Sequence, residues 1–193
     1  AIHVTQQLED CGSNEYCAVV LFNLHRFKLI NDVYGHHVGD ELLRRVAERL
    51  KAIVGTLGQC ARFGGDEFAI VVKGGDAPDL ARQLADQVVE RMAEPFKAGS
   101  RLHQISCSAG LAFVKGGDGK TPEDLMKQAD LALLWARDEG GGTWQQFNLK
   151  MMKDIEEQQQ LEDDLRSAVT NGDFDLHYQP IADLDGKGVV VCE

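Results

Sequence analysis

Long apolar runs are missing from this 193-residue sequence. No stretch approaches the ~20 residues of a membrane-spanning helix, and the N-terminus lacks the basic and then apolar pattern of a secretory signal. We therefore expect no membrane contact by this segment. The sequence opens and closes abruptly, as expected for a fragment of a longer protein that could be anchored through regions outside it.

Paired cysteines are missing as well. The five cysteines (Cys11, Cys17, Cys60, Cys107 and Cys192) are odd in number and have no CxxC spacing, so neither a disulfide framework nor a zinc site is indicated. Cys17, Cys60 and Cys107 lie in apolar runs and are expected to be small core residues. This cysteine usage indicates a reducing, cytoplasmic compartment.

Positive charge is scarce. The 20 basic residues against 31 acidic ones leave a formal net charge of −11, which argues against nucleic acid or an anionic membrane surface as the main partner. A small nucleotide held through metal ions remains compatible with this charge. The hydrophobic fraction of 44% can build a sizeable core, and the length allows one full domain and part of another.

The most informative stretch is residues 62–72, Arg-Phe-Gly-Gly-Asp-Glu-Phe-Ala-Ile-Val-Val, which predicts a β-hairpin. Gly64 and Gly65 allow a sharp turn and the close approach of a ligand. Asp66 and Glu67 stand at its tip as hard oxygen ligands suited to Mg²⁺. Taken alone, Gly-Gly-Asp-Glu is more often a solvated acidic turn, so the surrounding sequence has to decide.

Apolar periodicity predicts strands that alternate with helices, and hence an α/β architecture with helices over a central sheet. Besides the hairpin, strands are expected at 16–24, 102–114 and 144–147, and helices at 26–34, 38–54, 78–92 and 121–139. Gly110 predicts a bulge or kink in the strand 102–114. Residues 35–40 are expected to connect the first two helices.

Residues 22–43 read Phe-Asn-Leu-His-Arg-Phe-Lys-Leu-Ile-Asn-Asp-Val-Tyr-Gly-His-His-Val-Gly-Asp-Glu-Leu-Leu. Together with the hairpin they resemble the GGDEF family of diguanylate cyclases, which condense two GTP into cyclic di-GMP. The resemblance covers about residues 15–148. It implies a fold like that of nucleotide cyclases and the polymerase palm, with a central, mostly antiparallel sheet flanked by helices.

The remaining segments complete a predicted domain plan. Residues 1–14 are expected to be the end of a linker helix, 15–148 the GGDEF domain, and 149–172 a charged connector helix with a sparse apolar line. Residues 173–193 include Phe-Asp-Leu-His-Tyr-Gln-Pro-Ile at 174–181 and end at Glu193. They resemble the start of an EAL domain, a cyclic di-GMP phosphodiesterase, which is truncated here.

The resemblance also implies roles for individual residues. Asp66 and Glu67 would be catalytic and would hold Mg²⁺ or Mn²⁺ with Asn23 and the Leu24 backbone. GTP would be bound by residues near its guanine and phosphates: Phe27, Lys28, Asn31, His36, Asp40, Leu43, Gly64, Gly65 and Arg137. Considered one at a time, each residue has a structural explanation: Asn31 as a polar surface residue, His36 as a loop residue and Leu43 as an ordinary core residue. Jointly, at this spacing, they favour binding.

Several positions depart from the family pattern. Active members usually have aspartate where this chain has Asn23 and His25, and the first aspartate is a metal ligand. Asparagine removes the negative charge and histidine suits Mg²⁺ poorly, so metal affinity should fall. Gly141 stands where an arginine grips the triphosphate. Gly55 and Gly58 replace the arginine and aspartate of a product-inhibition site, so feedback there is not expected.

Three hypotheses follow. The first is a degenerate GGDEF domain that binds GTP and regulates an attached EAL phosphodiesterase. The second is a working diguanylate cyclase, which requires a homodimer because each subunit supplies one GTP. The third is a dimerisation scaffold that binds no nucleotide.

Overall fold

The computed structural model describes residues 12, 14–175, 177, 180–182 and 189–192. The chain divides into two compact units, Ala1–Met152 and Lys153–Glu193. Except for Gly12 and Asn14, the predicted linker helix at 1–14 lies outside the described residues.

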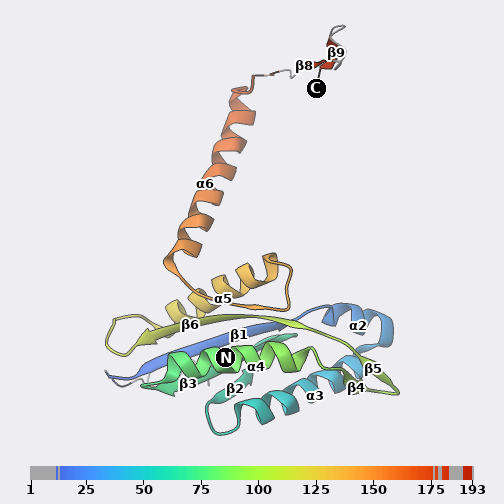
Figure 1. Cartoon of the computed structure of the whole chain (residues 1–193), viewed down its shortest axis with the longest axis vertical. Coiled ribbons are helices and arrows are strands. Elements are labelled where there is room, and N and C mark those ends of the chain that lie inside the picture. The colour runs from blue at the N-terminus through green and yellow to red at the C-terminus, as the bar shows by residue number, and fades with distance from the viewer. Residues whose placement is uncertain (1–11, 13, 176, 178–179, 183–188, 193) are drawn as a thin grey trace. The chain divides into compact units, whose positions relative to one another are not determined.

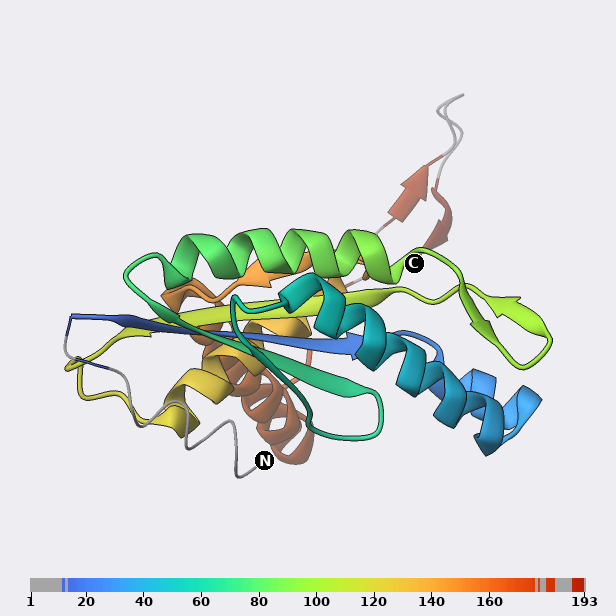
Figure 2. The same ribbon diagram turned by 90° about the horizontal axis from the view of Figure 1, so that it is seen from below.

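The first unit contains a five-stranded sheet in the order β2-β3-β1-β6-β7 (Figure 1). Its strands are β1 Tyr16–Leu24, β2 Gln59–Arg62, β3 Glu67–Gly74, β6 Cys107–Lys115 and β7 Trp144–Gln146. Among these strands only β6 and β7 pair in parallel, while β1 lies between β3 and β6 and is antiparallel to both (Figure 2). The predicted mostly antiparallel sheet and the hairpin of β2 and β3 are confirmed.

Helices cover both faces of this sheet. They are α3 His36–Val54 and α4 Ala77–Met92 on one face and α5 Pro122–Asp138 on the other, while α2 Phe27–Tyr34 packs against α3 (Figure 1). Successive side chains of a strand point to opposite faces. In β1, Val20 and Phe22 therefore join the core with α3 and α4, whereas Val19 and Leu21 join the core under α5.

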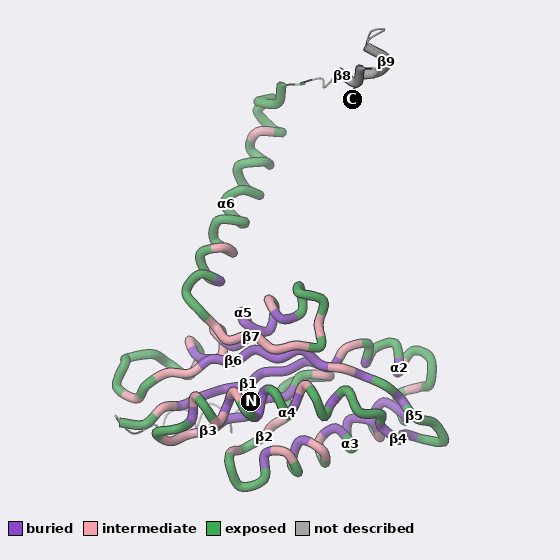
Figure 3. Tube along the Cα trace, in the orientation of Figure 1, coloured by how far each residue is buried: buried purple, intermediate pink, exposed green. Residues whose placement is uncertain are grey.

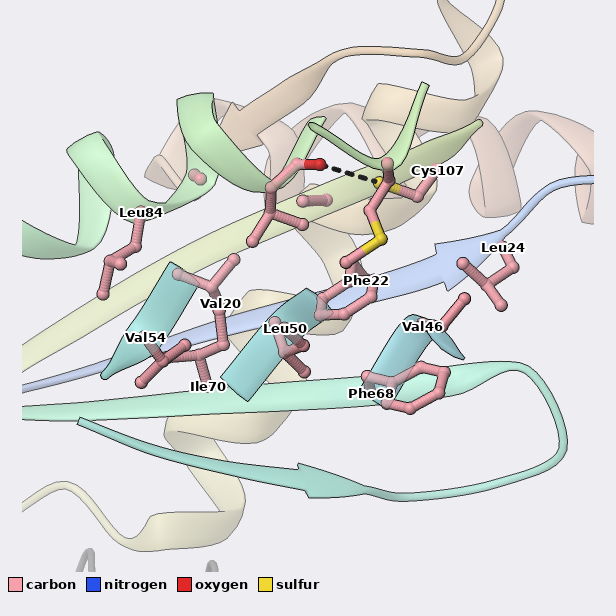
Figure 4. Close-up of a cluster of buried hydrophobic side chains, with 14 of the residues drawn as sticks. Val20, Phe22, Leu24, Val46, Leu50, Val54, Phe68, Ile70, Leu84 and Cys107 are labelled. Atoms are coloured by element: carbon pink, nitrogen blue, oxygen red, sulfur yellow. Dashed lines mark hydrogen bonds between the residues drawn. The ribbon is translucent and has the colours of Figure 1, made fainter. Parts of the chain in front are cut away.

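The larger core is a layer of aliphatic and aromatic side chains between the sheet and α3 and α4 (Figure 4). Phe22 and Phe68 stack across the β1–β3 pair, with ring centroids 5.3 Å apart and planes 8° from parallel. Cys107 is fully buried in this layer, and burial raises the pKa of its thiol to about 12. Its predicted role as a small core residue is confirmed.

Two predicted boundaries are wrong. Residues 102–114 do not form one strand: β5 Arg101–His103 pairs with β4 Phe96–Ala98 in a separate hairpin, and β6 starts only at Cys107. The apolar alternation continues across the break, so periodicity alone misses it. Likewise α3 begins at His36, and only Gly35, with φ 84°, separates it from α2. The predicted connecting segment 35–40 is therefore mostly helix.

Gly110 produces no bulge, because the pairing of β1 with β6 is continuous and places Leu21 opposite Gly110. Its function is close packing. A Cβ atom at this position would lie 2.1 Å from the Ala129 carbonyl oxygen and 2.2 Å from the Leu133 nitrogen of α5. The glycine thus lets the α5 backbone approach the sheet.

The segment 149–172, predicted to be a connector helix, contains the helix α6 Leu149–Asn171. It is exposed along most of its length, with Met151 as its buried residue (Figure 3). In the second unit, β8 Pro180–Ala182 and β9 Val189–Cys192 form an antiparallel pair. Among the described residues, no helix combines the length and apolar composition needed to cross a membrane.

The substitution Gly110→Ala should lower the free energy of unfolding by about 3 kcal/mol, because the methyl group must displace the α5 backbone. Urea unfolding of both proteins measures the difference. Gly75→Ala is the matched control, since a Cβ atom there meets nothing within 4 Å, and it should change stability by less than about 0.5 kcal/mol. Equal stability of the two variants would contradict the close approach of α5 to β6.

Candidate functional site

The predicted metal-binding residues meet at one end of the central sheet. Asn23 lies directly opposite Glu67 in the pairing of β1 with β3. The Leu24 amide donates a hydrogen bond to the Asp66 carbonyl oxygen over 3.0 Å. Asn23 is buried, whereas Glu67 is exposed. The structure therefore brings the backbones of these four residues together at the ends of β1 and β3.

The turn that carries the two carboxylates is held by its own residues. The Phe63 amide donates to the Glu67 carbonyl oxygen over 2.8 Å. The Arg62 guanidinium donates from Nε to the Gly64 carbonyl oxygen over 3.0 Å and from Nη2 to that of Gly65 over 2.8 Å. These bonds fix the glycine carbonyls. A Cβ atom on Gly65 would meet nothing within 4 Å, so the space beside it is open to a ligand.

The donor set at this end of the sheet consists of oxygen atoms, which suit Mg²⁺ or Mn²⁺. Within the described ranges there is no group of three or more His, Cys, Asp or Glu side chains that could hold a metal ion. Asp66 and Glu67 supply two carboxylates, and Asn23 supplies a neutral amide. These residues fit a cation that completes its coordination with phosphate oxygens, as Mg²⁺ commonly does.

Two predicted guanine contacts line a groove beside the hairpin. Asp40 and Leu43 of α3 border a space of about 380 Å³, and Arg62 of β2 borders it as well. Leu43 is buried and Asp40 is exposed, so this groove offers an apolar surface next to a carboxylate. A purine with donor groups on one edge matches this combination.

Asn31 lies on α2, close to the first turn of α3. Its Oδ1 atom is buried and has no hydrogen-bond partner among the described residues. A Cβ atom on Gly39 would lie 1.8 Å from that oxygen, so Gly39 makes room for the amide. Unpaired buried polar atoms are rare in folded proteins. Sequence reasoning missed Gly39.

The other predicted nucleotide contacts surround α2. Phe27 is buried at its start, where it joins the core, and Lys28 is exposed beside it. His36 is exposed in the first turn of α3. Arg137 is exposed in the last turn of α5. The groove with Asp40 and Leu43 is lined by neither His36 nor Arg137.

His25 is held by two serines that sequence reasoning missed. Ser106 Oγ lies 3.2 Å from its Nδ1, and Ser108 Oγ lies 2.9 Å from its Nε2. Ser108 also donates its single hydrogen to the Ala136 carbonyl oxygen, 3.4 Å away. Its oxygen then accepts a hydrogen bond from Nε2–H, so Nε2 carries a proton. In the neutral ring Nδ1 accepts the hydrogen bond from the Ser106 hydroxyl.

Electrostatics favours the same neutral form. Burial lowers the pKa of His25 from the ordinary 6.5, and the positive charges of Arg137 and then Arg26 lower it further. The folded chain therefore takes up this proton at a lower pH than the unfolded chain. The contribution of His25 to stability is complete above about pH 6.5 and is lost as the pH falls through the lowered pKa.

Gly141 leaves space for the His25 ring. Its φ of 74° favours glycine, and a Cβ atom there would lie 2.2 Å from Cε1 of His25. The imidazole thus occupies the space in which a side chain at position 141 would begin. The two departures from the family pattern, His25 and Gly141, form one structural feature.

Comparison with known proteins identifies the domain. A profile of the family described as "Diguanylate cyclase, GGDEF domain" matches residues 2–143. This chain belongs to the GGDEF family. The first unit is similar in fold to the GGDEF domain of TpbB (YfiN) from Pseudomonas aeruginosa, with a TM-score of 0.71 and 28% identity over 80% of this chain and 90% of that domain.

Relatives include longer signalling proteins. The sequence is 41% identical over 163 residues to the bifunctional diguanylate cyclase/cyclic di-GMP phosphodiesterase MucR of P. aeruginosa, covering 84% of this chain and 24% of MucR. It is 34% identical over 189 residues to the cyclic di-GMP phosphodiesterase NbdA of the same organism, covering 94% of this chain and 23% of NbdA. The chain spans about a quarter of these relatives.

The substitution Gly141→Ala should destabilise the protein far more when His25 is present than in the His25→Ala background. In that background only the backbone strain of a left-handed alanine, about 1 kcal/mol, remains. A double-mutant cycle measured by urea unfolding gives the coupling energy. Equal costs in the two backgrounds would show that the ring does not fill the space at position 141.

Proposed function

We propose that this GGDEF domain binds GTP and regulates an attached cyclic di-GMP phosphodiesterase, and that it is a weak cyclase or none. The observation that carries this proposal is the Asn23–Glu67 pair at the end of β1. Asn23, the residue opposite Glu67, has an uncharged side chain. GGDEF domains in general use GTP and a divalent metal. The loss of a negatively charged ligand would therefore lower the affinity of the site for the metal.

Asp66 and Glu67 would hold Mg²⁺ or Mn²⁺ in this domain, with Asn23 and the Leu24 carbonyl as weaker ligands. A bound metal would neutralise phosphate charge and position the reacting groups. Replacing one carboxylate by an amide keeps an oxygen donor but removes a negative charge, which lowers cation affinity. Guanine recognition would use Asn31, Asp40 and Leu43.

The domain plan supports a regulatory role. We assign residues 15–148 to the GGDEF domain, 149–172 to a connector and 173–193 to the start of an EAL domain. MucR is named for both activities and NbdA for the phosphodiesterase activity alone. The helix α6 leads directly from the GGDEF domain into the proposed EAL segment. Nucleotide occupancy would act on the phosphodiesterase through this helix.

Titration of the purified chain with GTP and with a non-hydrolysable analogue, in Mg²⁺ and in Mn²⁺, should show binding of both. Chromatography of the GTP sample should show no cyclic di-GMP. Asp40→Ala should weaken GTP binding by about 10-fold, since it removes a charged hydrogen-bond acceptor for the base. Asp173→Ala, which lies outside the GGDEF segment, is the matched control and should leave binding unchanged.

The regulatory part is tested in the full-length protein. GTP should change its rate of cyclic di-GMP hydrolysis, and Asp40→Ala should shift that response to higher GTP concentration. A hydrolysis rate that is independent of GTP would contradict regulation. Absence of any nucleotide binding would leave the dimerisation scaffold as the function.

The second candidate is an active diguanylate cyclase, which the retained pair Asp66 and Glu67 on an intact hairpin favours. It would act as a homodimer, because each subunit supplies one GTP, so the rate per subunit would rise steeply with protein concentration.

Asn23→Asp should raise Mg²⁺ affinity on the order of 10-fold and increase or create cyclic di-GMP formation, because it restores a ligand charge beside Glu67. Titration with Mn²⁺ in the presence of GTP and product chromatography measure the two effects. Asn171→Asp adds the same charge at the end of α6 and should have neither effect. Unchanged metal affinity in Asn23→Asp would show that this side chain does not reach the metal.

A further inference from the structure

A second cavity borders His25. It measures about 400 Å³ and is bordered by His25, Arg26, Ser106 and Gly140, together with Ala93, Gln104 and Ile105. No aspartate or glutamate is among these lining residues. The cavity is therefore locally basic in a chain whose formal net charge is −11.

Arg26 has an unusual backbone. With φ 60° and ψ 16° it is the one non-glycine residue with positive φ in the described part of the chain. A left-handed conformation costs roughly 1–2 kcal/mol for such a residue, and strained residues cluster at ligand sites. This conformation places the arginine at the start of α2, on the border of the cavity.

Two guanidinium groups near this cavity are unpaired. Neither Arg26 nor Arg137 has a hydrogen bond or an ion pair from its side chain to any described residue. Both lie close enough to His25 for their charges to act on its ring. No aspartate or glutamate of the cavity lining offsets the two arginines.

We propose that Arg26 is a phosphate-binding residue, and that Arg26 and Arg137 together hold the nucleotide phosphates directly, so that GTP binding by this chain does not require a divalent cation. Guanidinium groups bind phosphate through two parallel hydrogen bonds, and their charge substitutes for part of the metal charge. Arg26 thereby supplies the cation that position 141 cannot carry. This inference rests on the proposed binding of GTP.

The test is titration of the chain with GTP in Mg²⁺ and in EDTA. The dissociation constant should agree within about 3-fold between the two conditions. Arg26→Asn should weaken binding in EDTA by about 10-fold or more, because it removes a charge-assisted contact. Asparagine tolerates the left-handed backbone, so this variant should fold. Arg101→Asn, an exposed arginine beside Tyr34, is the control and should bind GTP as the parent chain does.

The outcomes separate the two proposals. GTP binding that is lost in EDTA, or that is unaffected by Arg26→Asn, would overturn the role of Arg26 while leaving nucleotide binding intact. No GTP binding in either condition would overturn the proposed function itself. Retained binding in EDTA that is weakened by Arg26→Asn but not by Arg101→Asn would establish the arginine site.

Discussion

The antiparallel pairing of β1 with β3 is the constraint on which the rest of the site depends. Its register puts Asn23 opposite Glu67, and the Leu24 amide continues the pairing by bonding the Asp66 carbonyl oxygen. A shift of one residue would turn Phe22 and Phe68 out of the larger core, so burial enforces this register. The same packing that stabilises the fold therefore determines which side chain faces the hairpin carboxylate.

The departures from the family pattern are connected to one another. Asn23 precedes His25 on the same strand end, the His25 ring is neutral and bonded to Ser106 and Ser108, and Gly141 leaves space for that ring. Negative charge is thus reduced on the β1 side of the site while Arg137 remains beside it. Under the proposed function, this combination would weaken metal binding while Arg137 still offers a positive charge to the nucleotide phosphates.

Short sequence patterns predicted the helices and strands in which they occur. The helix predicted at 121–139 is present as α5, and the structure has Thr121 as its N-cap, bonded reciprocally with Asp124. The hairpin predicted at 62–72 contains β3, which begins at Glu67. The apolar alternation at 102–114 predicted one strand, but it continues across the break between β5 and β6. The bulge predicted from Gly110 is absent, because this glycine allows close packing against α5.

By itself, the sequence determined the α/β class, the order of most helices and strands, the acidic hairpin and the family, because these depend on periodicity, capping and motif spacing within short segments. Only the tertiary structure decided that His25 meets Ser106 and Gly141, that Gly39 makes room for Asn31, and that Arg26 borders a basic cavity. These contacts depend on how closely separate backbone segments approach one another, and a local pattern does not encode that distance.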